Sequence, residues 1–472
     1  MVKSDSIYQV LLKYDFDLFR GNKGIEEYLS EHLNQYFKDI VDATEGNNSF
    51  LGEDFVGLLK NELRTLNNIC NEIPVILKEF DDGHIKDAYI RSNALFEYIK
   101  PYLLARFSWV GNNGTFYRIR QGDFRISEPS QSKTQKAELF HIKKALRNRI
   151  GAYRYSVAGY PCLYLASDRE LAWFECGMPK QFSFCQMVIT EDGENALKLV
   201  DFSHRPVDLL SSVTVWILNA RRQKNPEVEI EKIYNFLIKY IITYPVVSAC
   251  SVKVKDRGSK FVEEYIFPQL FMQWIRESND IDGVRYKSSL NSTLVQGMGA
   301  VNVALPVKSF REDGLDDHLA TKIGISDIGY LDVNKDFSKY QDALKALETY
   351  KNGLKLHIIE AEYSGNYVIE LIDLCDCIIK TYTALIDGNY INSELIFTYV
   401  DTLCDHADLM YKQRKAKIEE CIEKAPPNKK SCIDPDFIEA QFDKFHEIAS
   451  RILYKHSVFN FSYEPVSNIE YI

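Results

Sequence analysis

The sequence predicts an α+β protein in which a central domain built on a sheet is flanked by a helical domain at each end of the chain. Apolar residues recur at three- and four-residue spacing near both ends, whereas the middle contains short β-rich runs separated by turns. A chain of 472 residues is also too long for one hydrophobic core. We therefore expect a helical domain over 1–105, a sheet domain over 106–333 and a second helical domain over 334–472.

The N-terminal helices are predicted by a stripe of apolar residues. It consists of Ile25, Leu29, Leu33, Tyr36 and Ile40, whose spacing places them on one face of a helix. Glycine-containing breaks at 21–22 and 46–48 separate this helix from its neighbours. An apolar helix face has to be buried, so we expect these helices to pack against the sheet domain or against another subunit.

The middle of the chain is predicted to hold both strands and helices. Residues of high β-propensity gather in runs over 116–119, 162–166, 186–190 and 197–202. Longer apolar stretches over 228–241 and 263–275 predict helices that pack on this sheet, and Pro268 should begin or kink the second of them.

From about residue 334 the pattern becomes helical again. Tyr340, Leu344, Leu347 and Leu354 mark one amphipathic helix, and a second apolar stripe follows over 368–379. A polar loop with two prolines, over 424–430, separates the last helix from those before it. No fixed repeat length is present, so we do not expect a solenoid.

The composition is that of an ordinary globular protein, with 46% hydrophobic and 26% charged residues. A net charge of -10 argues against a nucleic-acid partner. The ten cysteines are scattered and indicate reduced thiols. Charge interrupts the first residues too early for a signal peptide, and no apolar run reaches the length of a membrane span. We expect a cytoplasmic protein that does not enter a membrane.

Four residues in the first part of the sheet domain carry groups that could hold and cleave a pyridine dinucleotide. Arg118 and Arg154 present planar forks of donors that match phosphate oxygens. Tyr164 offers a flat ring and a hydroxyl within an apolar strand. Glu175 follows an apolar run and should be partly withdrawn from water, where its charge could stabilise a positive ribose as a glycosidic bond breaks.

These residues, in their order and context, resemble the RES domain, a family of NAD-consuming proteins. The matches are, in chain order, Arg118 in FYR, Arg154 in GAYRYS, Tyr164 in LYLA, Glu175 in AWFEC and Ser288 in YKSSL. A final strand, NVALP, follows the serine, and Ser289 beside it is a rival candidate. The resemblance covers roughly 106–333, although the gap between Glu175 and Ser288 is long for a compact member.

The resemblance implies an ADP-ribosyltransferase-like fold, with NAD bound in a crevice of a split mixed sheet. It also implies that NAD is the substrate rather than a resident cofactor, and that the bond to nicotinamide is cleaved by water or by inorganic phosphate. Members of the family act as toxins restrained by an antitoxin, or as defence effectors. Glu175, Arg118, Tyr164 and Ser288 would be the catalytic residues, and Arg118, Arg154, Tyr164 and Ser288 would bind NAD.

Two alternatives belong to other functional classes. The segments from Arg451 to His456 and from Arg311 to His318 fit the loose arginine-to-histidine spacing of HEPN-type helical ribonucleases. This spacing is short enough to arise by chance, and the acidic charge argues against RNA as a substrate. The chain could also be a partner-binding protein with a decayed catalytic domain. The intact set of two arginines, a tyrosine and a glutamate argues against decay.

Other motifs in the sequence indicate no further function. Cys375, Cys377, Cys404 and His406 are metal-ligand types, but the first two lie in a predicted helix and lack a second CxxC pair, so no metal is expected. The sequence contains no GxGxxG, no phosphate loop and no GxSxG elbow, which disfavours other nucleotide-binding and hydrolase folds.

Overall fold

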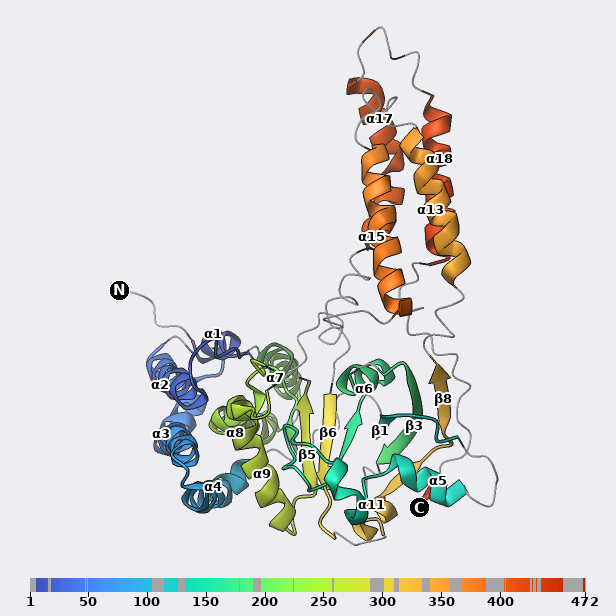
Figure 1. Cartoon of the computed structure of the whole chain (residues 1–472). Helices are drawn as coiled ribbons and strands as arrows, with labels where there is room; N and C mark the ends of the chain where they lie inside the picture. Colours follow the sequence, from blue (N-terminus) through green and yellow to red (C-terminus); the bar gives the residue numbers. More distant parts are fainter. Residues whose placement is uncertain are drawn as a thin grey trace.

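The structure is a computed structural model of the chain, and it describes most but not all residues. The described residues are 6–15, 18–46, 48, 50–103, 114–125, 132–177, 179–189, 197–223, 225–256, 259–288, 301–309, 314–332, 340–356, 367–387, 403, 405–424, 427, 430, 434–452 and 470–471. Within them the fold is α+β, with helices at both ends of the chain and a mixed sheet between them (Figure 1).

The N-terminal region is helical, as predicted. It contains α1 (Ile7–Lys13), α2 (Ile25–Thr44), α3 (Glu53–Asp81) and α4 (Ile85–Ile99), followed by the short turn η1 (Lys100–Tyr102). All five residues of the predicted stripe are buried on α2. Helix α1 begins at a capping box, in which the Ser6 hydroxyl accepts from the backbone of Gln9 and the Gln9 side chain accepts from the backbone of Ser6.

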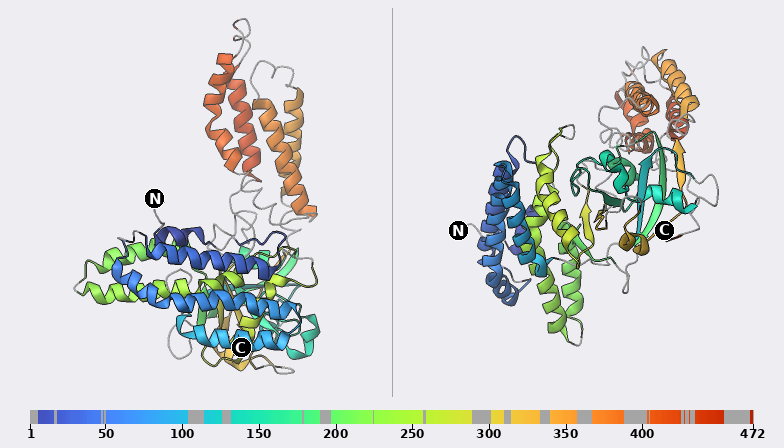
Figure 2. Two further views of the ribbon diagram at one scale, coloured as in Figure 1. Left: turned by 90° about the vertical axis from the view of Figure 1, so that its left-hand side faces the viewer. Right: turned by 60° about the horizontal axis from the view of Figure 1, so that its bottom comes forward.

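These helices share one hydrophobic core with helices from the middle of the chain. The partners are α7 (Pro206–Ala220), α8 (Pro226–Ser251), the turn η4 (Glu263–Tyr265) and α9 (Ile266–Glu277). Polar contacts reinforce the packing: the Trp274 indole donates to Glu97 at 2.7 Å, and Arg20 pairs with the buried Glu264 at 2.6 Å. Figure 2 shows the two sets of helices lying side by side. The N-terminal helices are therefore bound into the sheet domain rather than packed around a core of their own.

The sequence predicted no apolar run long enough to span a membrane, and helix α8 does not fit that prediction. By length and composition it could cross a membrane, but 78% of its most apolar window is buried inside the structure. Its lining residues belong to the core shared with α3 and α9. This degree of burial is typical of a core helix. Pro268 lies in the first turn of α9, where proline is tolerated, as predicted.

The sheet has nine strands among the described residues. They are β1 (Thr115–Gln121), β2 (Cys162–Ala166), β3 (Gln181–Ile189), β4 (Leu199–Phe202), β5 (Gly283–Lys287), β6 (Val301–Pro306), β7 (Ile323–Ile325), β8 (Gly329–Asp332) and β9 (Glu470–Tyr471). The order is β4-β5-β6-β2-β1-β3-β7-β9, with β8 also paired to β3. Strands β4 and β5 are parallel, and the other described pairs are antiparallel.

The four predicted strands are present, but β1 extends past the predicted 116–119 at both ends and β4 begins at Leu199 rather than at 197. Strand β2 has the predicted bounds, but β3 begins five residues before the predicted 186. Its first half, with buried Phe182, Ser183 and Phe184, lacks the apolar–polar alternation that marks a half-exposed strand. A strand buried on both faces gives a weaker signal, and this part of β3 pairs with both β1 and β8.

The sheet consists of two halves that meet at one residue pair. Strands β2 and β6 pair over five residues and β1 and β3 over seven, whereas β1 and β2 pair only at Tyr117 and Ala166. Helix α6 (Arg169–Glu175) lies at one end of this junction (Figure 1). Helices α5 (Ser132–Leu139) and α11 (Asp317–Lys322), with the turn η3 (Lys144–Arg149), lie toward the other end. The sheet is mixed, as predicted.

The C-terminal region is a group of helices that projects from the body (Figure 1). It contains α13 (Gln341–Leu356), α15 (Tyr367–Asp387), α17 (Arg414–Lys424) and α18 (Pro435–Ser450), which we call the C-terminal bundle. Its apolar residues form one buried cluster with Leu171, Trp173 and Phe174 of α6. After the bundle the chain returns to the sheet as β9, which pairs with β7. This return was not predicted, because a two-residue strand has no periodicity to detect.

Candidate functional site

One face of the β5–β6–β2 half carries a group of polar and aromatic side chains. Asn302 on β6 pairs with Ala166 on one side and with Tyr286 on the other. Paired residues share a face of a sheet, and so do residues two apart on one strand. Tyr164, two residues before Ala166, therefore lies on the same face as Asn302 and Tyr286.

Helix α6 brings Glu175 to this face. Asp168 immediately precedes the helix, and its carboxylate accepts from the backbone of Leu171 at 3.3 Å, while buried Trp173 and Phe174 hold the helix in the core. Glu175 is its last residue. One carboxylate oxygen, Oε1, accepts from the Ser288 hydroxyl at 2.7 Å and from Asn302 Nδ2 at 2.6 Å. The structure thus brings together two candidate residues, Glu175 and Ser288, that are 113 positions apart in sequence.

The exposure of Glu175 differs from the sequence prediction. We expected a carboxylate partly withdrawn from water, but Glu175 is exposed. The apolar residues that precede it bury their own side chains in the core and leave the end of the helix outside it. Its charge is held by directed hydrogen bonds rather than by an apolar setting.

Arg118 lies at the junction of the two halves, one residue beyond the Tyr117–Ala166 pair. Its Nη1 donates to the carbonyl oxygen of Tyr164 at 2.9 Å, and its buried Nε has no hydrogen-bond acceptor in the described part of the chain. Burial lowers the pKa of Arg118 from its ordinary value. The charged guanidinium group of Arg118, whose Nε has no acceptor in the described part of the chain, thus lies where β1 and β2 separate.

Cys176 shows that Arg118 and Glu175 lie in the same neighbourhood. Its thiol donates to the carbonyl of Ile119 on β1 at 3.4 Å, which ties the end of α6 to the strand that carries Arg118. Cys176 is exposed as a residue, but withdrawal of its thiol from water raises the pKa to about 11, while Arg118 lowers the pKa and Glu175 raises it. Both charges therefore act on one thiol.

Arg154 is buried and is engaged by the backbone. Its two terminal nitrogens donate to the carbonyls of Cys250 at 2.8 Å and Val252 at 3.0 Å, at the C-terminal end of α8. This is the contact that a cation makes with the unpaired carbonyls of a helix end. In this structure Arg154 secures α8 to the turn before β2, and its predicted contact with NAD stays a prediction.

Tyr164 is the centre of a tyrosine group. Its hydroxyl donates to Ser156 Oγ at 3.1 Å and accepts from the backbone of Tyr155 at 3.2 Å. The Tyr153 ring lies edge-on to it at 6.0 Å, and the rings of Tyr155 and Tyr286 are 4.7 Å apart. Burial raises the pKa of Tyr164 and of Tyr286 well above the ordinary tyrosine value, so both hydroxyls are neutral donors.

Two members of the site were not among the predicted residues. Tyr286 precedes Ser288 by two positions, and this spacing on a strand signals a shared face that could have identified it. Asn302 begins the final strand, but its contact with Glu175 depends on strand pairing and on the position of α6. No local sequence signal could have found that contact. Ser289, the rival of Ser288, lies outside the described residues.

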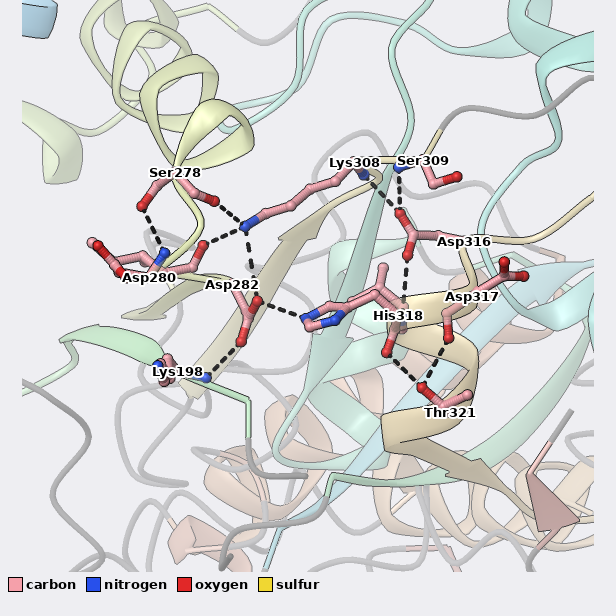
Figure 3. Close-up of polar contacts among 12 residues, drawn as sticks. Lys198, Ser278, Asp280, Asp282, Lys308, Ser309, Asp316, Asp317, His318 and Thr321 are labelled. Atoms are coloured by element: carbon pink, nitrogen blue, oxygen red, sulfur yellow. Dashed lines mark hydrogen bonds and ion pairs between the residues drawn. The ribbon is translucent and has the colours of Figure 1, made fainter. Parts of the chain in front are cut away.

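The arginine-to-histidine pairs of the ribonuclease alternative lie elsewhere. Arg311 and His456 are outside the described residues. His318 lies on α11 at the far end of β5 and β6, where it contacts Asp282 at 2.7 Å (Figure 3). Arg451 is exposed and pairs with Glu447, one helical turn before it. The described members of these pairs are thus engaged in local contacts.

The cysteines weighed as metal ligands give no site in the described part of the chain. Cys375 is buried on α15, and burial raises the pKa of its thiol to about 12. Cys404 lies outside the described residues. Among the described residues no group of three histidine, cysteine, aspartate or glutamate side chains could hold a metal ion.

Comparison with known proteins gives one informative relative. The chain is 30% identical over 277 residues to a protein of Bacillus subtilis (strain 168) named "Putative toxin YopC". The match covers 57% of this chain and 59% of the relative, so the chain spans about three fifths of the relative's length. No family model matches the chain, and no solved structure matches it significantly. The chain is therefore similar over more than half its length to a protein named as a toxin.

Proposed function

We propose that this chain is a toxin that depletes NAD by cleaving the bond between nicotinamide and ribose. The observation that carries the proposal is the 2.7 Å hydrogen bond between Ser288 and Glu175. Both residues were candidates from the sequence, and each comes from a distant part of the chain. Their meeting beside Tyr164 and Arg118 supports a common site for the predicted set.

The chemistry of the site suits this bond. Cleavage releases neutral nicotinamide and leaves positive charge on the ribose, which a fixed carboxylate stabilises. Glu175 supplies that carboxylate, held at Oε1 by two donors. The tyrosine group offers flat rings against which the cationic nicotinamide ring could stack before the bond breaks.

Arg118 is the residue that we assign to the phosphates or the ribose. Its unused Nε and the rest of its fork lie at the junction between the half-sheets, near Glu175. Arg154 supports the proposal less directly. It holds the 153–156 turn, whose backbone and Ser156 hydroxyl orient Tyr164.

The biological setting follows from the relative and from the chemistry. A protein that destroys NAD must be restrained in its own cell, so we propose an antitoxin or another regulatory protein as a partner. The C-terminal bundle is the proposed place for regulation or self-association, because its core includes α6, the helix that presents Glu175. We propose a cytoplasmic location, where NAD and inorganic phosphate are both available.

Product analysis tests the activity. Purified protein is incubated with NAD, with and without inorganic phosphate, and the products are identified by chromatography and mass spectrometry. If water is the acceptor, we expect nicotinamide and ADP-ribose with or without phosphate; if phosphate is the acceptor, we expect nicotinamide and ADP-ribose 1-phosphate only when phosphate is present. The Glu175→Ala variant controls for contaminating enzymes. Absence of nicotinamide release by the wild-type protein would overturn the proposal.

A further inference from the structure

We infer that Asn302 is a positioning residue that selects which oxygen of Glu175 faces the substrate. The inference rests on the proposed function. Asn302 is 3% exposed and is paired with a strand on each side, so its side chain is attached to a rigid part of the sheet. Its Nδ2 lies 2.6 Å from Glu175 Oε1.

The identity of the two groups fixes the direction of this bond. An ionised carboxylate can only accept, so the amide must turn its nitrogen toward Glu175. A carboxylate held in this way presents its charge in a fixed direction, and a fixed carboxylate can stabilise a positive ribose. An asparagine here therefore sets the place of its neighbour.

The two donors to Glu175 converge on one oxygen. Ser288 and Asn302 both donate to Oε1, whereas Oε2 has no hydrogen-bond donor in the described part of the chain. Ser288 lies just after β5, while Asn302 lies within β6 and is the more buried of the two. We assign Oε2 as the oxygen that meets the ribose, and Asn302 as the group that holds the carboxylate in that orientation.

Two substitutions test the assignment by activity. Asn302→Ala removes the donor and should lower kcat by about ten- to a hundredfold with KM little changed, the usual effect of losing a group that orients a reacting side chain. Asn302→Asp replaces the donor with a second carboxylate, so the acidic limb of the pH–rate profile should move to higher pH. Ser167→Ala is the matched control, because Ser167 bonds the backbone of Val301, one residue from Asn302.

A stability measurement tests the same contact without any activity. In Asn302→Asp two carboxylates meet at the Glu175 contact, so the variant should unfold at a lower temperature than wild type at pH 8 and less so at pH 5. Adding Glu175→Gln should remove that pH dependence. Each variant is compared with wild type at the same pH, so the contributions of groups common to all of them, such as Lys287 and the buried histidines, cancel.

The outcomes separate this inference from the proposed function. A wild-type protein that releases no nicotinamide defeats the function, while the thermal comparison still decides whether Asn302 controls Glu175. If Asn302→Asp loses no more stability at pH 8 than at pH 5, the contact does not exist in solution. If Asn302→Ala keeps the wild-type kcat and pH profile in an active enzyme, Asn302 does not position the carboxylate. Either result overturns the inference.

Discussion

The two ends of the β5–β6 pair carry polar networks of opposite design. At the far end, buried Asp282 accepts from the backbone of Lys198 at 2.9 Å and contacts His318 at 2.7 Å, and Lys308 donates to the carbonyls of Ser278 and Ile281 (Figure 3). At the near end, exposed Glu175 has donors on only one of its oxygens in the described part of the chain.

This difference distinguishes a polar network that holds the fold together from one that could bind a ligand. In the far network the charged groups bond to fixed partners that lie on α11 or just beyond the ends of α9, β4 and β6, so it ties these elements together. In the near network one carboxylate oxygen and the Arg118 fork keep unused capacity beside a group of aromatic rings. At the buried Arg118 Nε, unused capacity costs stability, and such capacity is retained where a ligand can use it.

The largest expected effect is on turnover at the near end. Glu175→Gln keeps the size of the side chain and removes its charge, so kcat for NAD should fall by about two to three orders of magnitude with a smaller change in KM. The thermal unfolding temperature should change little because the residue is exposed. Nicotinamide release is the measurement, and Glu227→Gln, at an exposed position of α8, is the matched control. Near-normal turnover would remove Glu175 from the site.

The far network should respond in the opposite way. Asp282→Asn leaves the partly buried Lys308 ammonium without its carboxylate, so the free energy of unfolding should fall by about 3 kcal/mol. The kcat of the folded protein should stay unchanged. Urea denaturation measures the loss. Asp280→Asn is the control, since Asp280 is exposed and its ion pair with Lys100 should matter little. Equal stability of the two variants would show that the far network is not a structural brace.

Arg118 tests whether the unused fork binds the substrate. Arg118→Lys keeps the charge and loses the planar set of donors, so NAD should bind about tenfold more weakly. Isothermal titration with Glu175→Gln as the common background allows binding to be measured without turnover. An unchanged affinity would mean that the bond to the Tyr164 carbonyl is the whole role of Arg118.

The pH dependence of stability should come mainly from buried histidines away from the site. His141 Nε2 accepts from the backbone of Asp316 at 2.8 Å, and burial lowers the pKa of His141, while burial lowers the pKa of His32 to about 4. A lowered folded-state pKa gives stability that is full above about pH 6.5 and is lost as pH falls toward the folded value. His141→Gln should flatten the fall in unfolding temperature below pH 6.5. The exposed His406→Gln should not.

The smallest effect is expected from the C-terminal bundle. Its core includes Trp173 and Phe174 of α6, so replacing 340–452 with a short linker should change NAD turnover by a few fold or change the assembly state. Removing 334–472 also removes β9, and comparison of the two deletions separates the bundle from the strand. Light scattering and an NAD assay measure both. Unchanged mass per assembly, after subtraction of the bundle, together with full turnover would end the regulatory proposal.

The amphipathic helices were the most predictable part of the fold. The five-residue stripe on α2 is buried as expected, because an apolar face fixes both the helix and its orientation. The core that the N-terminal helices share with α7–α9 was not predictable, because an apolar helix face shows that it is buried but not which element covers it. The return of the chain as β9 was missed for the same reason, because pairing is a property of the sheet.

The candidate site likewise contains residues that the sequence predicted and a residue that it could not predict. Residue types and order pointed to Glu175, Ser288, Tyr164 and Arg118, and the structure joins Ser288 to Glu175 and Arg118 to the backbone of Tyr164. The donor Asn302 could not be found, because its importance depends on a contact between β6 and α6 rather than on its neighbours in sequence. Arg154 was chosen for its chemistry, and the structure shows its fork bound to the end of α8.

The single pair that joins the half-sheets has a consequence for motion. A seam whose described strand pairing is Tyr117–Ala166, with the Arg118 bond to the Tyr164 carbonyl beside it, resists rotation less than a full ladder, so we expect the halves to open and close about it. Arg118 moves with one half, whereas Tyr164, Asn302 and Ser288 move with the other. A ligand that touches both would draw them together and slow the exchange of the amide hydrogens at the seam, leaving those within β3 and β6 unchanged.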